Sequence, residues 1–221
     1  MTSQEHYKNA GHPTGDAGRD LLDAMNTGTH ERLAHWSLPL FEQTIAAAPL
    51  KKPITSVLDV GCGGGANMAR LMNLFDNVHA YGLDHSSISV EKSKETNAAA
   101  VAQGRCHVIE GDVAALPYNN ESINAATAFE TIYFWPHVEA GLHEIIRVLT
   151  PGGIFMVCNE TDGRTIHQAR WSDLAQVSDF LTIYSQQQLV DFFTDTGFIN
   201  VHVKRHPQED WIVVLGQKPA E

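Results

Sequence analysis

Short apolar runs alternate with longer segments of helical periodicity through most of the chain. The apolar runs, which predict strands, cover residues 57–60, 78–83, 106–110, 123–129 and 153–159. The segments between them that predict helices are 66–75, 86–101 and 137–148. Helices that alternate with strands cross over between parallel strands, so this order predicts an α/β fold with helices on both faces of a parallel sheet.

The N-terminal part of the chain follows a different pattern. Residues 1–20 are polar and rich in Gly, His and Pro, which predicts a loop or an arm. Residues 21–48 have helical periodicity, which Gly28 and Pro39 divide. The positions expected to be buried are Leu21, Leu22, Met25, Leu33, Trp36, Leu40, Phe41 and Ile45. We expect a helical cover that precedes the sheet.

The C-terminal part predicts one more helix and two more strands. The helix is expected at 185–196 and the strands at 198–203 and 211–216. Residues 204–210 are few enough for a hairpin, so the last strand should be antiparallel to its neighbour.

Composition agrees with one folded domain. The chain has 221 residues, 43% of them hydrophobic, and we expect a single domain over 1–221 with a cap at 1–48, a core at 49–221 and an insertion at 161–184. No apolar run approaches the ~20 residues of a membrane span. Three scattered cysteines argue against a disulfide framework. The net charge of −11 disfavours a nucleic-acid surface. These features predict a cytoplasmic protein that binds neither membrane nor nucleic acid.

The first strand runs into a glycine-rich turn and then a helix. In Asp59-Val60-Gly61-Cys62-Gly63-Gly64-Gly65 the alternate glycines carry no Cβ, so a ligand can approach the backbone N–H groups at a helix N-terminus. The spacing from Gly61 through Gly63 to Ala66 also fits a dinucleotide fingerprint, with Asp84 as the ribose-binding acid 23 residues beyond Gly61. The turn therefore predicts a nucleotide-like cofactor and leaves its identity open.

Three further motifs follow this turn in a characteristic order. They are the segments 82–86 (GLDHS), 110–118 (EGDVAALPY) and 144–153 (EIIRVLTPGG). Together with residues 58–65, they resemble motifs of the class I S-adenosylmethionine-dependent methyltransferases. Within this class the chain is most similar to the small-molecule enzymes related to quinone biosynthesis. The resemblance extends over residues 50–217. It implies a Rossmann-like seven-stranded sheet of order 3-2-1-4-5-7-6 with strand 7 antiparallel. It also implies S-adenosylmethionine as cofactor, S-adenosylhomocysteine as product and a small-molecule methyl acceptor.

The resemblance assigns cofactor contacts residue by residue. The expected set is Tyr7, Asp59, Gly61, Cys62, Gly63, Asp84, His85, Asp112, Val113 and Phe129. Asp59 would order the turn and hold the methionine ammonium group, or would cap local N–H groups. Asp84 would accept both ribose hydroxyls, or would cap the next helix. Asp112 would accept from the adenine amine, or would stabilise a turn.

The segment after the fourth strand is expected to face the acceptor. In Phe129–Pro136 the aromatic side chains would be costly to leave in water, so they line an acceptor pocket or seat the following helix. We expect Phe134 in the core, with Tyr133 and Trp135 toward the pocket. Glu130 would bind an amine acceptor, take its proton, or bond to the N-terminal arm. The catalytic candidates are Glu130, Tyr133, His30 and His35, and the acceptor-binding candidates are Trp36, Trp135, Glu160 and Trp171.

Local spacing does not predict a metal site. His30 and His35 are one residue too far apart for a His-Glu-x-x-His zinc helix, and no Cys-x-x-Cys occurs, so we expect no metal.

Three functions compete with methyl transfer to a small molecule. A nicotinamide oxidoreductase is weakened by the lack of a Tyr-x-x-x-Lys pair, and a macromolecular methyltransferase by the lack of an Asn/Asp-Pro-Pro-Tyr segment. A non-catalytic cofactor-binding module remains open, as do the acceptor, the methylated atom and the oligomeric state.

Overall fold

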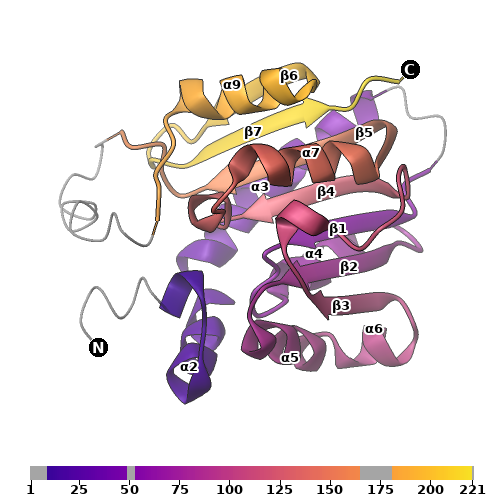
Figure 1. Cartoon of the computed structure of the whole chain (residues 1–221). Helices are drawn as coiled ribbons and strands as arrows, with labels where there is room; N and C mark the ends of the chain where they lie inside the picture. Colours follow the sequence, from indigo (N-terminus) through magenta and orange to yellow (C-terminus); the bar gives the residue numbers. More distant parts are fainter. Residues whose placement is uncertain (1–8, 49–52, 165–180, 221) are drawn as a thin grey trace.

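The centre of the fold is a seven-stranded sheet (Figure 1). The structure, a computed structural model, describes residues 9–48, 53–164 and 181–220. The strands are β1 (Ser56–Val60), β2 (His79–Asp84), β3 (Cys106–Glu110), β4 (Ile123–Phe129), β5 (Leu149–Asn159), β6 (Ile199–Arg205) and β7 (Ile212–Gln217). Their order is β3-β2-β1-β4-β5-β7-β6, and β7 is antiparallel to both β5 and β6. The predicted sheet order and the antiparallel last strand are confirmed.

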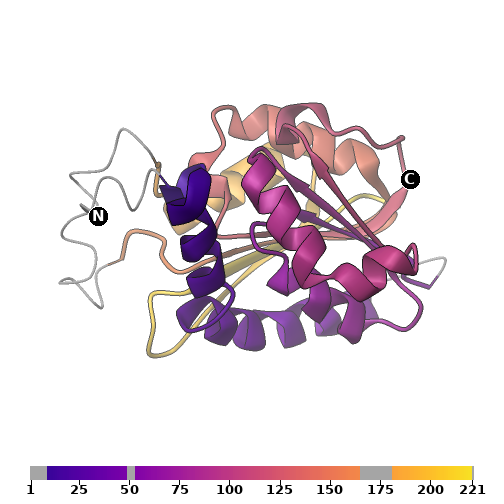
Figure 2. The ribbon, with the colours of Figure 1, turned by 90° about the horizontal axis from the view of Figure 1, so that it is seen from below.

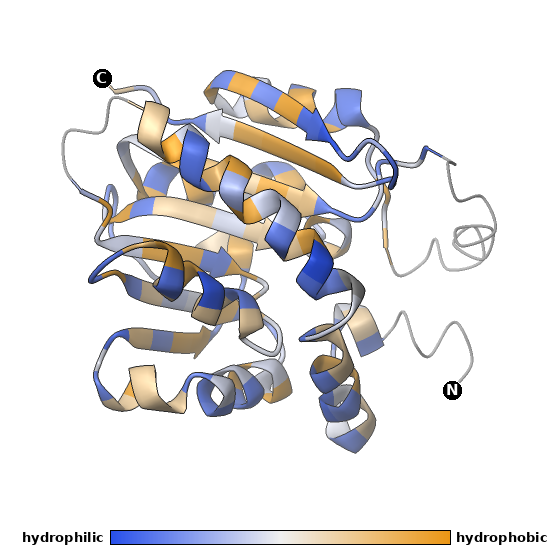
Figure 3. Ribbon diagram, turned by 180° about the vertical axis from the view of Figure 1, so that it is seen from behind, coloured by the Kyte–Doolittle hydropathy of each residue, from blue (hydrophilic) through white to orange (hydrophobic). Residues whose placement is uncertain are grey.

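The central strands are apolar on both faces because both faces are covered. Every residue of β1 and of β7 is buried. Figure 3 shows hydrophobic colour along β7, whereas hydrophilic and hydrophobic residues alternate along the edge strand β6. In register, Val57 of β1 lies between Ala80 of β2 and Ala125 of β4. The parallel strands β1, β2 and β4 therefore end at one edge of the sheet, where α/β folds bind ligands.

Helices form one layer on each face of the sheet (Figure 2). One core contains side chains of α3 (Thr29–Ala47), α4 (Ala66–Leu74), α5 (Ser87–Thr96) and α6 (Ala98–Ala102). The opposite core contains side chains of α7 (Val138–Val148) and α9 (Gln186–Thr196) and of the 3₁₀ turns η1 (Val113–Ala115) and η2 (Ile132–Phe134). The expectation of helices on both faces is confirmed.

The largest differences from the predicted element boundaries lie at three places. Helix α2 (Gly15–Met25) begins inside the segment 1–20, which was expected to form a loop or an arm, so that expectation was wrong for residues 15–20. The helix expected over 86–101 breaks at Asn97, whose side chain donates hydrogen bonds to the carbonyls of Gly65 and Ser93, both at 2.9 Å. The break thus ties this helix to the glycine turn. Strand β5 begins at Leu149 rather than at residue 153, because Leu149 already pairs with Ile123 of β4, ahead of a register irregularity that precedes the Ala125–Ile154 pair.

The N-terminal helices form the expected cover. Helix α2 (Gly15–Met25) ends before Gly28, which has a φ of 69°. Pro39 lies inside α3, so the expectation that it divides the helix was wrong. Its ring is exposed, while Leu33, Phe41 and Ile45 on the same helix are buried against the sheet. This packing compensates for the single backbone hydrogen bond that proline removes.

Helix α2 lies across the end of the sheet and is held there mainly by polar contacts. Its buried residues are Gly18 and Leu22. Ion pairs join Arg19 to Glu95 and Asp23 to Lys92, both on α5. Just before α2, the carbonyl of Pro13 accepts a hydrogen bond from Ser86 Oγ at 2.6 Å. None of the helices in the described ranges combines the length and the apolar character that a bilayer span requires.

Candidate active site

A cavity of about 520 Å³ lies at the carboxyl edge of the sheet, between the strand ends and the N-terminal cover. Its walls come from the glycine turn, from the ends of β2, β3 and β4, and from α2 and α3. The predicted cofactor residues that line it are Gly61, Cys62, Gly63, Asp84, His85, Asp112, Val113 and Phe129. The structure thus brings eight predicted positions from four strand ends into one cavity.

The glycine turn leaves room where a ligand would lie. Gly63 has a φ of 50°, and a Cβ built on it would meet nothing nearer than Leu22 Cδ2 at 3.6 Å. At Gly61 the situation is opposite, because a Cβ would come within 2.3 Å of Thr131 Cγ2. Gly61 therefore allows close packing of the turn on the β4 exit, whereas Gly63 keeps open space at the cavity wall.

Asp84 connects the end of β2 to the glycine turn. Its carboxyl group is buried, with Oδ2 accepting from Gly63 N at 2.9 Å and Oδ1 from Ser86 N at 3.0 Å. The cap of α5 is Ser86, whose Oγ accepts from Ser89 N at 3.4 Å, so Asp84 itself is not the cap. A carboxylate has several acceptor sites, so these two bonds leave capacity for a ligand hydroxyl.

Asp59 lies beneath the turn. It is 2% exposed, and Thr127 Oγ1 donates to its Oδ1 at 2.8 Å. Burial, with a smaller contribution from the Asp84 charge, raises the pKa of the Asp59 carboxyl from 3.8 to about 7. Asp59 is absent from the set of described residues that line the cavity. Its proposed contact with the methionine ammonium group stays a prediction.

Two more predicted cofactor positions have local roles that do not depend on a ligand. Asp112 is exposed, and its Oδ1 accepts from Ala114 N at 2.9 Å at the start of η1. The ring of His85 stacks on His12 with centroids 4.7 Å apart, so the N-terminal segment covers this side of the cavity. Tyr7 lies outside the described residues.

The aromatic segment after β4 is arranged differently from the expectation. Phe134 lines the cavity with Trp135, so its predicted place in the core was wrong. Tyr133 is buried instead, and its hydroxyl lies 3.4 Å from both Glu130 Oε1 and the Thr161 carbonyl. Burial raises the pKa of Tyr133 well above its usual value, so the phenol stays neutral and can donate to Glu130.

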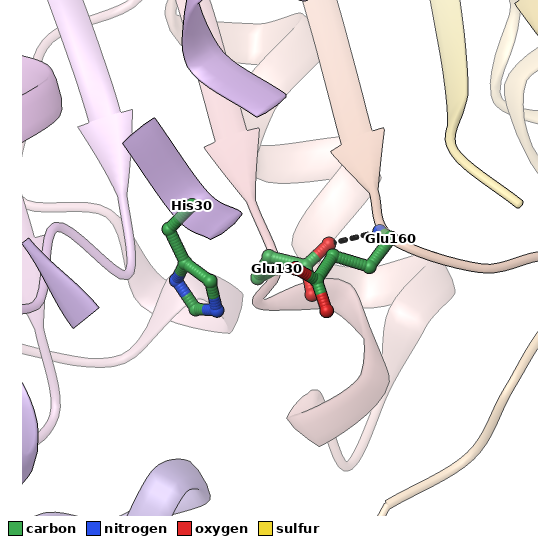
Figure 4. Close-up of side chains that lie close together, drawn as sticks. All are labelled: His30, Glu130 and Glu160. Atoms are coloured by element: carbon green, nitrogen blue, oxygen red, sulfur yellow. Dashed lines mark hydrogen bonds between the residues drawn. The ribbon is translucent and has the colours of Figure 1, made fainter. Parts of the chain in front are cut away.

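Glu130, Glu160 and His30 converge beside the cavity, and His30 and Glu130 line it (Figure 4). Glu130 follows β4 and Glu160 follows β5, and these paired parallel strands bring both carboxyl groups to the same edge. Glu160 is buried and donates its backbone N–H to Glu130 Oε1. His30 lies near the start of α3, and its ring faces the two carboxyl groups. One ring nitrogen of His30 and one carboxylate oxygen of each glutamate lie within 4.8 Å of one another.

The remaining predicted residues lie elsewhere. His35 is exposed on α3, and Trp36 packs near the rings of His206 and Trp211 at 5.4 and 6.0 Å. Neither is among the described residues that line the cavity. Trp171 is outside the described residues. The sequence reasoning did not identify Asn26 and Arg70, which line the cavity and are joined by a 3.4 Å hydrogen bond from Arg70 to the Asn26 carbonyl. The available signal was the spacing of Arg70 from Ala66, because residues one helical turn apart lie on the same face of α4, which faces the cavity.

The sequence profile of a family described as a methyltransferase domain matches residues 51–198. The chain belongs to this methyltransferase family. It is 26% identical over 171 residues to the rice chloroplastic 2-methyl-6-phytyl-1,4-hydroquinone methyltransferase 1, covering 77% of this chain and 49% of that protein. It is 31% identical over 154 residues to an O-methyltransferase of Pyrenophora dematioidea, covering 66% and 55%. The chain spans about half the length of these curated relatives.

The fold is also similar to that of a solved methyltransferase. Geranyl diphosphate C-methyltransferase from Streptomyces coelicolor, crystallised with Mg²⁺, geranyl diphosphate and S-adenosylhomocysteine, superposes with a TM-score of 0.67 at 12% identity. The match covers 95% of this chain and 86% of that one. At 12% identity, this superposition shows that the two chains share a fold.

Proposed function

We propose that this methyltransferase transfers the sulfonium methyl group of S-adenosylmethionine to a nucleophilic atom of a small molecule. The observation that carries the proposal is that one cavity is lined both by the glycine turn and Asp84 and by Glu130, Phe134 and Trp135. Family membership supports methyl transfer, and the cavity supports an acceptor small enough to be enclosed with the cofactor.

The residues present fit an adenosine cofactor. The open space beside Gly63, next to the N-terminus of α4, accommodates a carboxylate against backbone N–H groups. Asp84, at the end of β2, is the proposed acceptor for the ribose hydroxyls. Asp112 and Val113, at the end of β3, would lie beside adenine. Phe129 would then separate the cofactor from the acceptor end.

The contribution of the chain to the reaction is mainly positional. The sulfonium of the bound cofactor supplies an activated methyl group whose leaving group is a neutral thioether. Phe134 and Trp135 exclude water from the acceptor side, and the N-terminal cover closes the cavity above them. Holding a nucleophile about 3 Å from the methyl group accounts for much of the rate gain expected of such an arrangement.

The proposed environment is the cytoplasm, with a small-molecule acceptor and neither nucleic acid nor membrane as partner. All three cysteines are free and buried, as expected in a reducing compartment. The net charge of −11 supports the absence of a nucleic-acid surface.

Calorimetric titration with S-adenosylhomocysteine and, separately, NAD⁺ tests the cofactor assignment. Binding of S-adenosylhomocysteine alone is expected, whereas binding of NAD⁺ alone would overturn the proposal. Transfer of labelled methyl groups from S-adenosylmethionine to a panel of phenols, thiols, amines and prenyl compounds then tests catalysis. Cofactor binding with no transfer to any acceptor would favour a non-catalytic binding module.

A further inference from the structure

We propose that His30, Glu130 and Glu160 bind a divalent metal ion at the acceptor end of the cavity. One imidazole and two carboxylates supply the nitrogen and oxygen donors that Zn²⁺, Mn²⁺, Fe²⁺ and Co²⁺ accept. The three donors come from α3, the β4 exit and the β5 exit, and they all lie within 4.8 Å of one another. In Figure 4 the imidazole points toward the two carboxyl groups.

The electrostatics of the cluster favour a cation between these groups. Two carboxylates at this separation repel each other, and the burial of Glu160 removes water that would screen the repulsion. A divalent cation coordinated by both carboxylates would offset this repulsion, because its charge is opposite to theirs.

The surrounding structure holds Glu130 in place as it would hold a metal ligand. Glu130 has a φ of 58°, a left-handed conformation that is strained for a residue with a Cβ. Its Oε1 lies within hydrogen-bond reach of both the Glu160 N–H and the Tyr133 hydroxyl. Hydrogen bonds to a ligating carboxylate orient it toward the metal. Tyr133 acts here as a positioning residue, buried behind the carboxylate.

The cavity determines what the ion would do. His30 and Glu130 line it beside Phe134 and Trp135, so coordination positions that the chain does not fill would face the acceptor space. An acceptor hydroxyl or thiol bound there would lose its proton to water more readily, because the cation stabilises the anion that remains. This acceptor role rests on the proposed methyl transfer, whereas metal binding itself does not.

The sequence analysis expects no metal because it considers only donors that are close together along the chain, whereas the folded structure brings distant donors together. The His30–His35 pair was judged too widely spaced for a zinc helix, and the exposed His35 indeed takes no part in the cluster. The donors are instead His30 and two glutamates that lie 100 and 130 residues further along the sequence.

The test uses the full chain without an affinity tag, stripped with EDTA and dialysed. Titration with MnCl₂, followed by electron paramagnetic resonance, and with CoCl₂, followed by visible absorption, should each show one site per chain. Glu160→Gln, which preserves side-chain shape, and His30→Ala should each weaken binding by about tenfold or more. His35→Ala is the matched control on the same helix and should bind as the wild type does.

The outcomes separate this proposal from the proposed function. Wild-type protein that binds neither ion at millimolar concentration overturns the metal site, as does unchanged affinity in a Glu160→Gln protein whose circular dichroism is native. S-adenosylhomocysteine binding in the same preparations reports on the cofactor assignment alone. A wild-type chain that binds metal but no S-adenosylhomocysteine retains the metal site and refutes methyl transfer.

Discussion

The buried Asp59 should make the stability of this protein depend on pH in a direction opposite to that of most carboxylates. Its pKa rises from 3.8 in the unfolded chain to about 7 in the native state, chiefly because burial penalises the charge. Between these values the native state holds a proton that the unfolded chain has released. The free energy of unfolding therefore falls as pH rises toward 7 and levels off above it.

The magnitude follows from the pKa difference. Each pKa unit between the native and unfolded states corresponds to about 1.4 kcal/mol, so the full ionisation penalty is on the order of 4 kcal/mol. Asp59→Asn cannot ionise, yet its amide oxygen can still accept from Thr127 Oγ1. We expect this variant to gain about 3 kcal/mol of stability over the wild type as pH rises from 5 to 8.

Urea unfolding at pH 5, 6, 7 and 8 measures this difference directly. Asp16→Asn, at an exposed position of α2, is the matched control and should run parallel to the wild type. Thr127→Val removes the hydrogen bond that lowers the Asp59 pKa, so it should shift the pH-dependent region upward. A constant difference between wild type and Asp59→Asn over the whole range would refute the reasoning.

Three other predictions concern the cavity. Gly63→Val should abolish S-adenosylhomocysteine binding and lower the free energy of unfolding by about 1–2 kcal/mol. Gly104→Val is the control, because Gly104 also has a positive φ and open space but does not line the cavity, so only the free energy of unfolding should fall. Normal cofactor affinity in folded Gly63→Val would contradict the role of the turn. Asp84→Ala should weaken S-adenosylhomocysteine by about 2–3 kcal/mol in calorimetry, and a loss below about 0.5 kcal/mol would leave Asp84 a purely local role. Amide exchange over residues 9–36 should slow when S-adenosylhomocysteine binds, and unchanged exchange would limit the cover to a structural role.

The sheet and the cofactor side of the cavity could be predicted because their signals are local. The glycine turn directly follows a buried strand, Asp84 ends the next strand and Asp112 follows the one after it, so strand order alone brings them to one edge. Orientation within the aromatic segment could not be predicted. Tyr133 and Phe134 are adjacent in η2, where consecutive side chains point in different directions, and nothing local sets the phase of that short turn.

The acid end of the cavity depends on contacts between distant parts of the chain. Glu130 and Glu160 were candidates individually, but their approach depends on the register of β4 against β5. The approach of His30 depends on where α3 crosses the sheet. Pro39 was misread for a related reason, because the packing of α3 on the sheet outweighed a local helix-breaking preference.

The way α2 is attached makes access to the cavity sensitive to salinity. This helix buries little apolar area, and its ion pairs with α5 are partly exposed, so dissolved ions screen them. At ionic strengths where the Debye length falls to about 8 Å or less, these attractions weaken while the apolar sheet core does not. Opening of the cover should therefore become more frequent as salt rises, and the exchange of ligands with solvent should follow the ionic strength of the surroundings.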